Sequence, residues 1–415
     1  MKQKIKRGLI LGSAIAAMTG PVLADGQKAS VMHWWTSGSE AQALHVMAEA
    51  YNAAGGEWVD NAVPDFESAV AAATSAIISG NAPTALQFNA GSQIYDLAGQ
   101  GYLTDLTPMA EAGNWQEVLP AAIYKGITVE DKVYAVPVVN HGSSWLWISQ
   151  PALAKAGVTL PDSWAGFIPM LEKIKAAGII PLAHGGEAWQ ELEFLSNVLL
   201  FSGRDDLYKA VFVTGDLDVI RSDDFKAFAD EFKSLSNFID PGAPGRKWND
   251  ATAMVVNGSA AMQFMGDWAK AEFTAAGQVP GKDFDCVLGF GGHDRFLIGV
   301  DVFVFPKNKN DEAGPARELL VNTMMDPKVQ VAFNVKKGGL PTRLDADVTP
   351  LDMCAQRGYA AMQKAEQQVE IYSLTTTGDR EGALQDATST FWNTPGMTGA
   401  EFSELVAQAI EATDY

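Results

Sequence analysis

The chain has 415 residues, 47% of them hydrophobic, and 30 Lys and Arg stand against 50 Asp and Glu, which gives a formal charge of -20. A chain this acidic repels phosphate backbones, so nucleic acid is excluded as the expected partner. The length predicts two or three domains. Five scattered histidines and two cysteines have no metal-ligand spacing, and we expect neither a metal nor a cofactor.

Residues 1–24 have the order of a secretory signal: basic residues up to Arg7, an apolar run over 9–18, and small residues ending at Ala24. An N-terminal membrane anchor is the alternative. The apolar run is too short for it, because a bilayer core requires ~20 apolar residues. We therefore predict cleavage near Ala24 and export to the periplasm.

Strand and helix alternate through the first part of the mature chain. Residues 29–35 are predicted as a strand, and the polar loop that follows offers Ser37 or Ser39 as the cap of a helix. A second helix is predicted over 67–79 and a strand over 84–88. This order is typical of a parallel α/β lobe.

The extended stretch 134–139 contains Pro137, which cannot donate to a sheet ladder. We therefore expect an edge strand or a crossing between lobes. The elements predicted after it are strands over 145–148, 179–183, 260–265 and 296–305 and helices over 161–164, 167–177, 251–257, 313–325 and from Pro327 onward, with a helical tail over 351–415.

The predicted elements cross between lobes several times, and the strand over 296–305 is interpreted as the return to the first lobe. We predict an N-terminal lobe of residues 25–137 with 296–345 and a C-terminal lobe of residues 138–295 with 346–415. Lobes that share hinges in this way suit closure around a ligand.

Several of the eleven tryptophans lie beside polar residues in predicted loops. Flat rings cover the apolar faces of a sugar, while carboxylates, amides and ammonium groups bond its hydroxyls. A single indole is more often part of a core. Trp34 and Trp35 are stronger candidates, because neighbouring strand residues point to opposite faces and one of the two must leave the core.

Other functions remain as alternatives. Glu40 and Asp301 are candidates for the paired carboxylates of a secreted glycoside hydrolase or another sugar-modifying enzyme. No local motif joins an acid to a nucleophile, and no nucleophile elbow, phosphate loop or zinc signature is present, so we expect no catalytic residues. A binding protein for a peptide or a polyamine would have a cleft dominated by charge rather than by aromatic rings.

Cys286 and Cys354 are the only two cysteines. Export to an oxidising compartment permits them to pair, and we favour one disulfide. Two unrelated buried thiols are the alternative.

Stretches along the whole mature chain resemble, in order, one known family. They are His33 to Gly38, Val136 to Val138, Trp145 to Trp147, Pro181 to Gly186 with Trp189-Gln190, Pro244 to Arg246 with Trp248-Asn249, Ala251 to Met254, Met265 to Lys270, and Phe391 to Asn393. The chain resembles the family 1 extracellular solute-binding proteins of ABC sugar importers, and most of all their glucose/mannose-binding branch.

The resemblance implies a two-lobed periplasmic-binding-protein fold with hinge strands, type II as in maltose-binding protein, and a monosaccharide held between the lobes. The implied partners are that sugar and the membrane permease of an ABC importer, with the protein working as a monomer. The implied ligand-binding residues are the aromatic walls and the polar rim: Trp34, Trp35, Glu40, Asn89, Trp248, Trp268, Asp301 and Lys337. It also implies the Cys286–Cys354 bridge.

Two departures from the branch concern specificity. Glucose-binding relatives tend to carry a basic residue where Asn89 stands, and a histidine near Tyr372 or Ser373. Loss of two donors changes which hydroxyl pattern is satisfied, and a buried unsatisfied group costs about 1–3 kcal/mol. An epimer, a derivative or a disaccharide is therefore the alternative to glucose.

Overall fold

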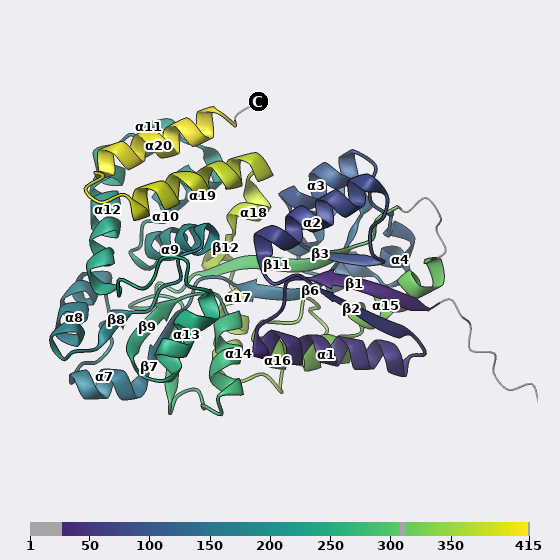
Figure 1. Cartoon of the computed structure of the whole chain (residues 1–415), viewed down its shortest axis with the longest axis horizontal. Coiled ribbons are helices and arrows are strands. Elements are labelled where there is room, and N and C mark those ends of the chain that lie inside the picture. Colours follow the sequence, from purple (N-terminus) through teal and green to yellow (C-terminus); the bar gives the residue numbers. More distant parts are fainter. Residues whose placement is uncertain (1–26, 308–312, 414–415) are drawn as a thin grey trace, which may run out of the picture.

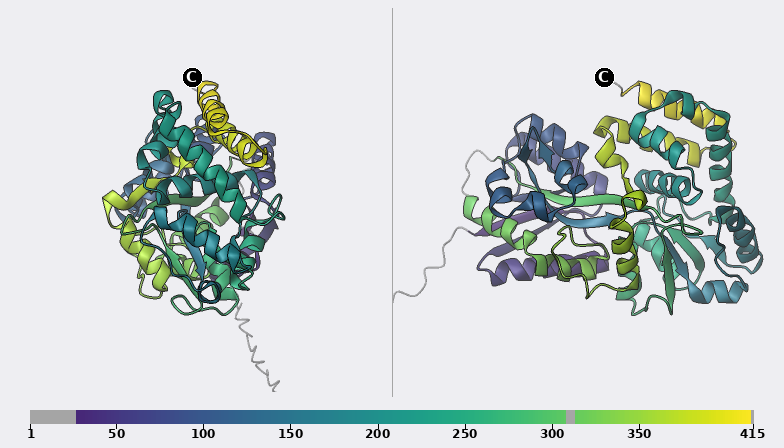
Figure 2. Two further views of the ribbon diagram at one scale, coloured as in Figure 1. Left: turned by 90° about the vertical axis from the view of Figure 1, so that its left-hand side faces the viewer. Right: turned by 180° about the vertical axis from the view of Figure 1, so that it is seen from behind.

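The structure is a computed structural model that describes residues 27–307 and 313–413. The predicted signal peptide lies outside these residues. Two α/β halves lie side by side, each built on its own sheet (Figure 1), and the views in Figure 2 show the same division. The predicted two-lobed α/β fold is confirmed.

The first sheet draws its strands from distant parts of the chain. Its order is β12-β11-β3-β1-β2, with β6 paired to β11. β1 runs parallel to β2 and β3, whereas β11 is antiparallel to β3 and β6. The strands are β1 (Lys28–His33), β2 (Glu57–Ala62), β3 (Ala85–Asn89), β6 (Ala135–Gly142), β11 (Phe296–Val304) and β12 (Gln368–Glu370).

Helices cover both faces of the first sheet. In Figure 1, α2 and α3 lie above it and α1 and α16 below it. Helix α1 begins at Gly38, after the loop that follows β1, because Ser37 caps it and Glu40 completes a capping box. The helices of this half are α1 (Gly38–Ala53), α2 (Phe66–Ser79), α3 (Ser92–Gly99), α4 (Thr107–Ala112), α5 (Trp115–Val118), α6 (Ala121–Gly126), α15 (Gly314–Met325) and α16 (Pro327–Lys337), with a small ribbon of β4 (Thr128–Val129) and β5 (Lys132–Val133).

The second sheet has the order β10-β7-β9-β8. Its strands are β7 (Leu146–Ser149), β8 (Ile180–Leu182), β9 (Ala260–Phe264) and β10 (Phe284–Val287). Its helices are α7 (Gln150–Ala156), α8 (Trp164–Ala176), α9 (Ala188–Phe201), α10 (Asp205–Lys209), α11 (Leu217–Ile220), α12 (Asp223–Ser234), α13 (Trp248–Val256) and α14 (Trp268–Ala275), with the later helices α17 (Met353–Met362), α18 (Tyr372–Thr375), α19 (Gly378–Asn393) and α20 (Gly399–Glu411). Among these, α19 packs on α9 and α20, so the tail completes this half.

The extended stretch with Pro137 forms β6, which is buried along its whole length. Among the described strands, β6 pairs with β11, and Pro137 stands opposite Val302. On its other side, a single bridge joins Asn140 to Leu340. The prediction of an edge strand is therefore confirmed. β6 continues to Gly142, beyond the predicted lobe boundary at residue 137, and the boundaries themselves remain a prediction.

Two local predictions were wrong, and one strand was missed. The helices expected over 161–164 and 167–177 form one helix, α8, which begins at Trp164 and contains Pro169. The tail is not all helical, because the short strand β12 joins the first sheet beside β11. The strand β2 was not predicted, since its acidic and amide residues resemble a loop.

Cys286 of β10 and Cys354 of α17 form the predicted disulfide, with both side chains buried. The bond fastens α17 to an edge strand of the second sheet. Over the ranges that the structure describes, no helix has the length and apolarity needed to cross a membrane.

Candidate ligand-binding site

A cavity of about 280 Å³ lies between the two halves. All eight residues predicted to bind a ligand line it: Trp34, Trp35, Glu40, Asn89, Trp248, Trp268, Asp301 and Lys337. Trp34 and Trp35 lie in the loop after β1, which ends at His33, two residues before the end of the predicted strand. The other six come from α1, β3, β11 and α16 of the first half and from α13 and α14 of the second. The fold thus brings together side chains that are up to three hundred residues apart. That they bind a ligand remains a prediction.

The two adjacent tryptophans differ in burial. Trp34 is half-buried at the cavity and packs edge-on against Phe66. Trp35 is 1% exposed and packs against Phe303 and Phe333. The expectation that one of the pair leaves the core is met by Trp34, and Trp35 forms part of the cavity floor rather than a free wall.

Glu40 and Lys337 form a buried ion pair at the first half's edge of the cavity. Lys337 Nζ lies 3.1 Å from Glu40 Oε1, and both side chains are almost fully buried. The ammonium of Lys337 also lies 5.5 Å from the ring of Trp35 and 5.9 Å from that of Trp268. Because Trp268 belongs to the second half, this lysine contacts rings from both halves.

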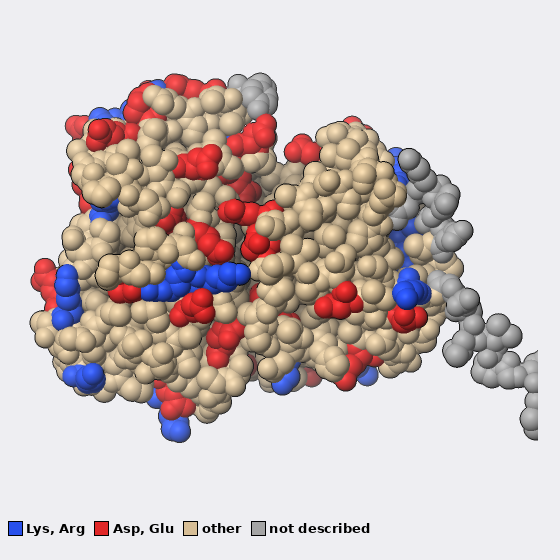
Figure 3. Space-filling view, viewed as in Figure 1, with Lys and Arg blue, Asp and Glu red and all other residues tan. Residues whose placement is uncertain are grey.

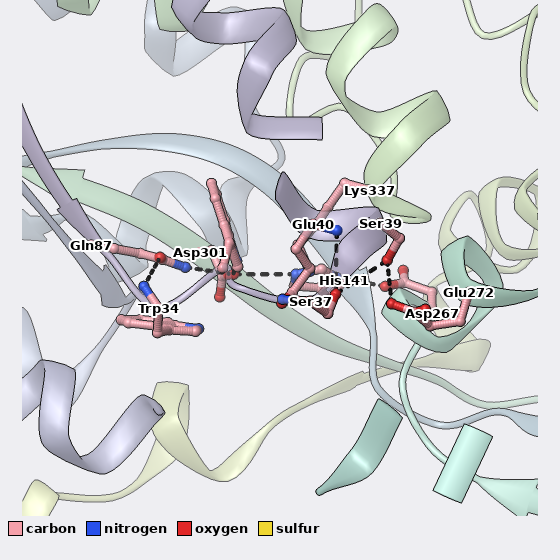
Figure 4. A network of polar contacts seen from close by, with 11 residues as sticks. Trp34, Ser37, Ser39, Glu40, Gln87, His141, Asp267, Glu272, Asp301 and Lys337 are labelled. Atoms are coloured by element: carbon pink, nitrogen blue, oxygen red, sulfur yellow. Dashed lines mark hydrogen bonds and ion pairs between the residues drawn. The ribbon is translucent and has the colours of Figure 1, made fainter. Parts of the chain in front are cut away.

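Asp301 accepts three contacts on one oxygen. Its Oδ2 atom lies 3.2 Å from Trp35 Nε1, 3.1 Å from Gln87 Nε2 and 3.3 Å from His141 Nε2. Figure 4 shows these contacts running from Trp34 through Gln87, Asp301 and His141 to Asp267. Glu40 is thus paired with Lys337, and Asp301 is bonded to Trp35, Gln87 and His141, so both carboxylates already have partners within the protein.

His141 links the two halves and was not predicted as a site residue. Its Nδ1 atom lies 2.5 Å from Asp267 Oδ1, and the backbone N–H of Gly142 donates to Asp267 Oδ2 at 2.7 Å. Burial alone would lower the pKa of His141, but the carboxylates of Asp267 and Asp301 raise it to about 9. The imidazole is therefore charged at neutral pH. In the sequence, the polar pair Asn140 and His141 directly after the apolar stretch 134–139 was the signal that could have identified this residue.

Three indoles of the second half face the cavity. Trp189 and Trp268 lie 6.2 Å apart between ring centroids, and Trp268 packs edge-on against His141. Trp248, at the start of α13, is half-buried beside them. The Nε1 atom of Trp268 has no hydrogen-bond partner among the described residues. An unpaired buried donor that faces a cavity is suited to a ligand oxygen.

Another part of the cavity wall carries carboxyl groups that sequence reasoning missed. Glu193 of α9 and Glu381 of α19 both line the cavity and are buried. Burial raises the pKa of Glu193 to about 8 and that of Glu381 to about 7. A glutamate between Leu192 and Phe194 of α9 was the signal in the sequence for the first of them.

The two departures from the glucose-binding pattern also lie in this cavity. Asn89 ends β3 opposite Asp301, and Tyr372 and Ser373 line the wall beside the carboxyl groups. Tyr372 Oη lies 3.5 Å from Glu193 Oε2. Among the described residues, no group of three or more His, Cys, Asp or Glu side chains is arranged to hold a metal ion.

A cavity between two α/β halves, walled by indoles and buried polar groups from both, defines a two-lobed ligand-binding protein. Residues 35–331 match the model of the family described as bacterial extracellular solute-binding protein. The chain belongs to this family.

Relatives and solved structures agree with this assignment. The chain is 37% identical over 377 residues to the "Probable sugar-binding periplasmic protein" of Mesorhizobium japonicum, covering 90% of each chain. Similar solved structures are a chitin oligosaccharide binding protein (TM-score 0.78, 18% identity, 93% of this chain and 98% of that one) and a bacterial solute receptor described as preferring β-D-galactopyranose (0.76, 18%, 94% and 98%). A maltose-bound T. maritima protein is also similar (0.74, 18%, 93% and 99%). These structural likenesses show the fold.

Proposed function

We propose that this protein is the periplasmic sugar-binding component of an ABC importer and that it binds a monosaccharide, glucose or a close relative. The observation that carries the proposal is the set of indoles that the two halves place around one cavity: Trp34 from the first half and Trp189, Trp248 and Trp268 from the second. Rings on both sides of a gap suit the two apolar faces of a pyranose.

The polar groups of the cavity support a sugar as the ligand. Carboxylates, an amide, an ammonium and an indole N–H all face one space, as a ring of hydroxyls requires. The name of the Mesorhizobium japonicum relative, which matches over 90% of this chain, supports the same class of ligand and a periplasmic location.

The size of the cavity favours a small sugar. Its volume of about 280 Å³ is at the lower end of the ~300–1,000 Å³ that is usual for small-molecule sites. The similar solved structures are named for ligands from a monosaccharide to oligosaccharides, so fold alone does not choose between them. The volume favours a monosaccharide over a long oligosaccharide.

The lobes would close on the sugar and present the closed form to a membrane permease. We propose lobes of residues 25–137 with 296–345 and of residues 138–295 with 346–415, with hinges where the chain crosses between them. A ligand favours closure only through contacts that are better in the closed form. Indoles from both halves supply such contacts.

The test is calorimetric titration of the purified mature protein with a panel of hexoses and with maltose, supported by a thermal-shift assay. We expect at least one monosaccharide to bind and to raise the melting temperature, since ligand binds only the folded state. Incubation with aryl glycosides should give no turnover. Failure of every sugar to bind would contradict the proposal, and product release that depends on Glu40 or Asp301 would favour an enzyme.

A further inference from the structure

Two buried carboxyl groups in the cavity each have one oxygen without a partner. Glu193 is 2% exposed and Glu381 is 6% exposed. Glu193 Oε1 and Glu381 Oε2 make no hydrogen bond with any described residue. Glu193 Oε2 accepts a long contact of 3.5 Å from Tyr372 Oη, and Ser143 also hydrogen-bonds to this carboxyl group. Glu381 Oε1 accepts a long contact of 3.4 Å from Gln385 Nε2. Buried polar atoms are rarely left in this state, so a ligand is the natural partner for both.

The positive charges at the cavity are already engaged elsewhere. Lys337 is paired with Glu40, and His141 lies between the carboxylates of Asp267 and Asp301. The charge of His141 also lowers the pKa of Glu193, but it makes no ion-pair contact with that group. Lys247 is exposed and donates to a backbone carbonyl at 3.3 Å. Within residues 27–307 and 313–413, neither Glu193 nor Glu381 lies in ion-pair contact with a Lys, Arg or His.

Acidic groups therefore outnumber basic ones around the cavity. Its lining includes six carboxyl residues, Asp65, Glu40, Glu187, Glu193, Asp301 and Glu381, against three basic ones, Lys247, Lys337 and His141. Figure 3 shows acidic side chains gathered at the hollow between the two halves. A cavity with this imbalance favours a ligand that brings a positive charge.

Donors and acceptors are also out of balance beside α18. The two unpartnered carboxyl oxygens are acceptors when ionised, and the nearby Tyr372 and Gln385 donate to the other oxygens of the same groups. A sugar hydroxyl offers one hydrogen and brings acceptor lone pairs of its own. An ammonium offers three hydrogens and no acceptor, so it matches this wall better.

Building on the proposed function, we infer that the sugar bound by this cavity carries a primary ammonium group, and that the carboxylates of Glu193 and Glu381 receive it. The indoles hold the pyranose ring, and the two carboxylates select the amino sugar over the parent hexose. The indoles therefore contact the sugar ring, while the ammonium group contacts a different wall of the same cavity, formed by Glu193 and Glu381.

Burial of the two carboxyl groups gives this inference a second readout. With pKa values of about 8 for Glu193 and about 7 for Glu381, both hold a proton for part of the time at neutral pH. The titratable groups around them are His141, Asp267, Tyr208 and Tyr372. An ammonium beside the carboxyl groups favours their ionised form, so binding of an amino sugar releases protons.

The experiment is calorimetry at pH 7 with three sets of probes: glucosamine, galactosamine and mannosamine; their N-acetyl derivatives; and the parent hexoses. One amino sugar should bind at least about tenfold more tightly than its N-acetyl and parent forms, because hydrogen bonds to charged groups contribute more than neutral ones. Its apparent enthalpy should change with the ionisation enthalpy of the buffer, and that of a neutral sugar should not.

Glu193→Gln and Glu381→Gln should each reduce the preference for the amino sugar over the parent hexose by about tenfold or more. Glu318→Gln, at an exposed position of α15, is the matched control and should leave this preference unchanged. Circular dichroism confirms that the variants are folded.

The outcomes separate this inference from the proposed function. A neutral hexose that binds as tightly as its amino form, or Gln variants that weaken both equally, would overturn the inference and leave the sugar-binding function intact. If no sugar binds, or if spermidine binds and no sugar does, the proposed function itself is overturned.

Discussion

His141 Nδ1 lies 2.5 Å from Asp267 Oδ1, and this contact joins β6 of the first sheet to the segment that begins α14 in the second half. The same imidazole reaches Asp301 through Nε2. One charged ring therefore holds carboxylates from both halves, directly beside the cavity.

This ion cluster predicts a loss of stability at alkaline pH. The pKa of His141 is raised from 6.5 to about 9 in the folded protein, so its contribution is fully present below pH 6.5 and is lost as pH rises through 9. The free energy of unfolding should fall by about 3 kcal/mol more across this window in the wild type than in His141→Gln. Urea unfolding of both proteins at pH 6 to 10 measures this difference in the free energy of unfolding. Parallel pH profiles for the two proteins would show that His141 does not carry the charge.

Glu193 predicts a pH effect with a different origin. The folded protein holds the proton of this carboxyl up to a pKa of about 8, whereas the unfolded chain loses it near the ordinary glutamate pKa of 4.5. The folded form binds more protons between these values, so stability falls as pH rises through them. Glu193→Gln, which stays neutral, should become more stable than the wild type above pH 8, by a few kcal/mol. Glu318→Gln is the control, and an equal gain for both variants would contradict the prediction.

Trp34 and Trp35 should respond differently to replacement by Ala. Trp35 is buried against Phe303 and Phe333, and its loss should lower the free energy of unfolding by about 3–5 kcal/mol. Trp34 is half-buried at the cavity, so its loss should mainly weaken sugar binding. Denaturant unfolding and calorimetry on both variants test this. Equal stability of the two variants would contradict the assignment of Trp35 to the cavity floor.

The Cys286–Cys354 bond closes a loop across a separation of 68 residues. In the chain-entropy model, a loop of that length stabilises the folded protein by about 4 kcal/mol. The double variant Cys286→Ala with Cys354→Ala should lose about this amount in urea unfolding, and reductant should destabilise the wild type but not the variant. A wild type that is equally stable with and without reductant, after reduction is verified by alkylation and mass, would contradict this prediction.

Local sequence patterns were sufficient for most of the fold. The strand before Trp34, the cap at Ser37 and the edge strand at Pro137 follow from alternation, capping and the missing N–H of proline. The pattern failed where tertiary context decides. β2 carries polar residues because it is a partly exposed edge strand, and β12 is a three-residue strand defined by its pairing with β11.

Only part of the site could be predicted from the sequence, because tertiary context also decides which polar groups meet there. Indoles next to polar loop residues were visible in the sequence, and they line the cavity. His141, Glu193 and Glu381 were missed, because each gains its setting from elements far away in the chain. Glu193 faces Tyr372 across 179 positions, and His141 meets Asp267 across 126. Only the assembled fold brings such groups together.

The central claim is that indoles from both halves hold one sugar between them. The most direct measurement is the dissociation constant of the best-binding sugar for the wild type, Trp34→Ala and Trp248→Ala, with Trp58→Ala and Trp164→Ala as half-buried controls outside the cavity. The account predicts that each cavity variant loses at least about tenfold in affinity, since a stacked ring contributes on the order of 1 kcal/mol beyond its buried area, while the controls bind as the wild type does. Unchanged affinity in either Trp34→Ala or Trp248→Ala would contradict it.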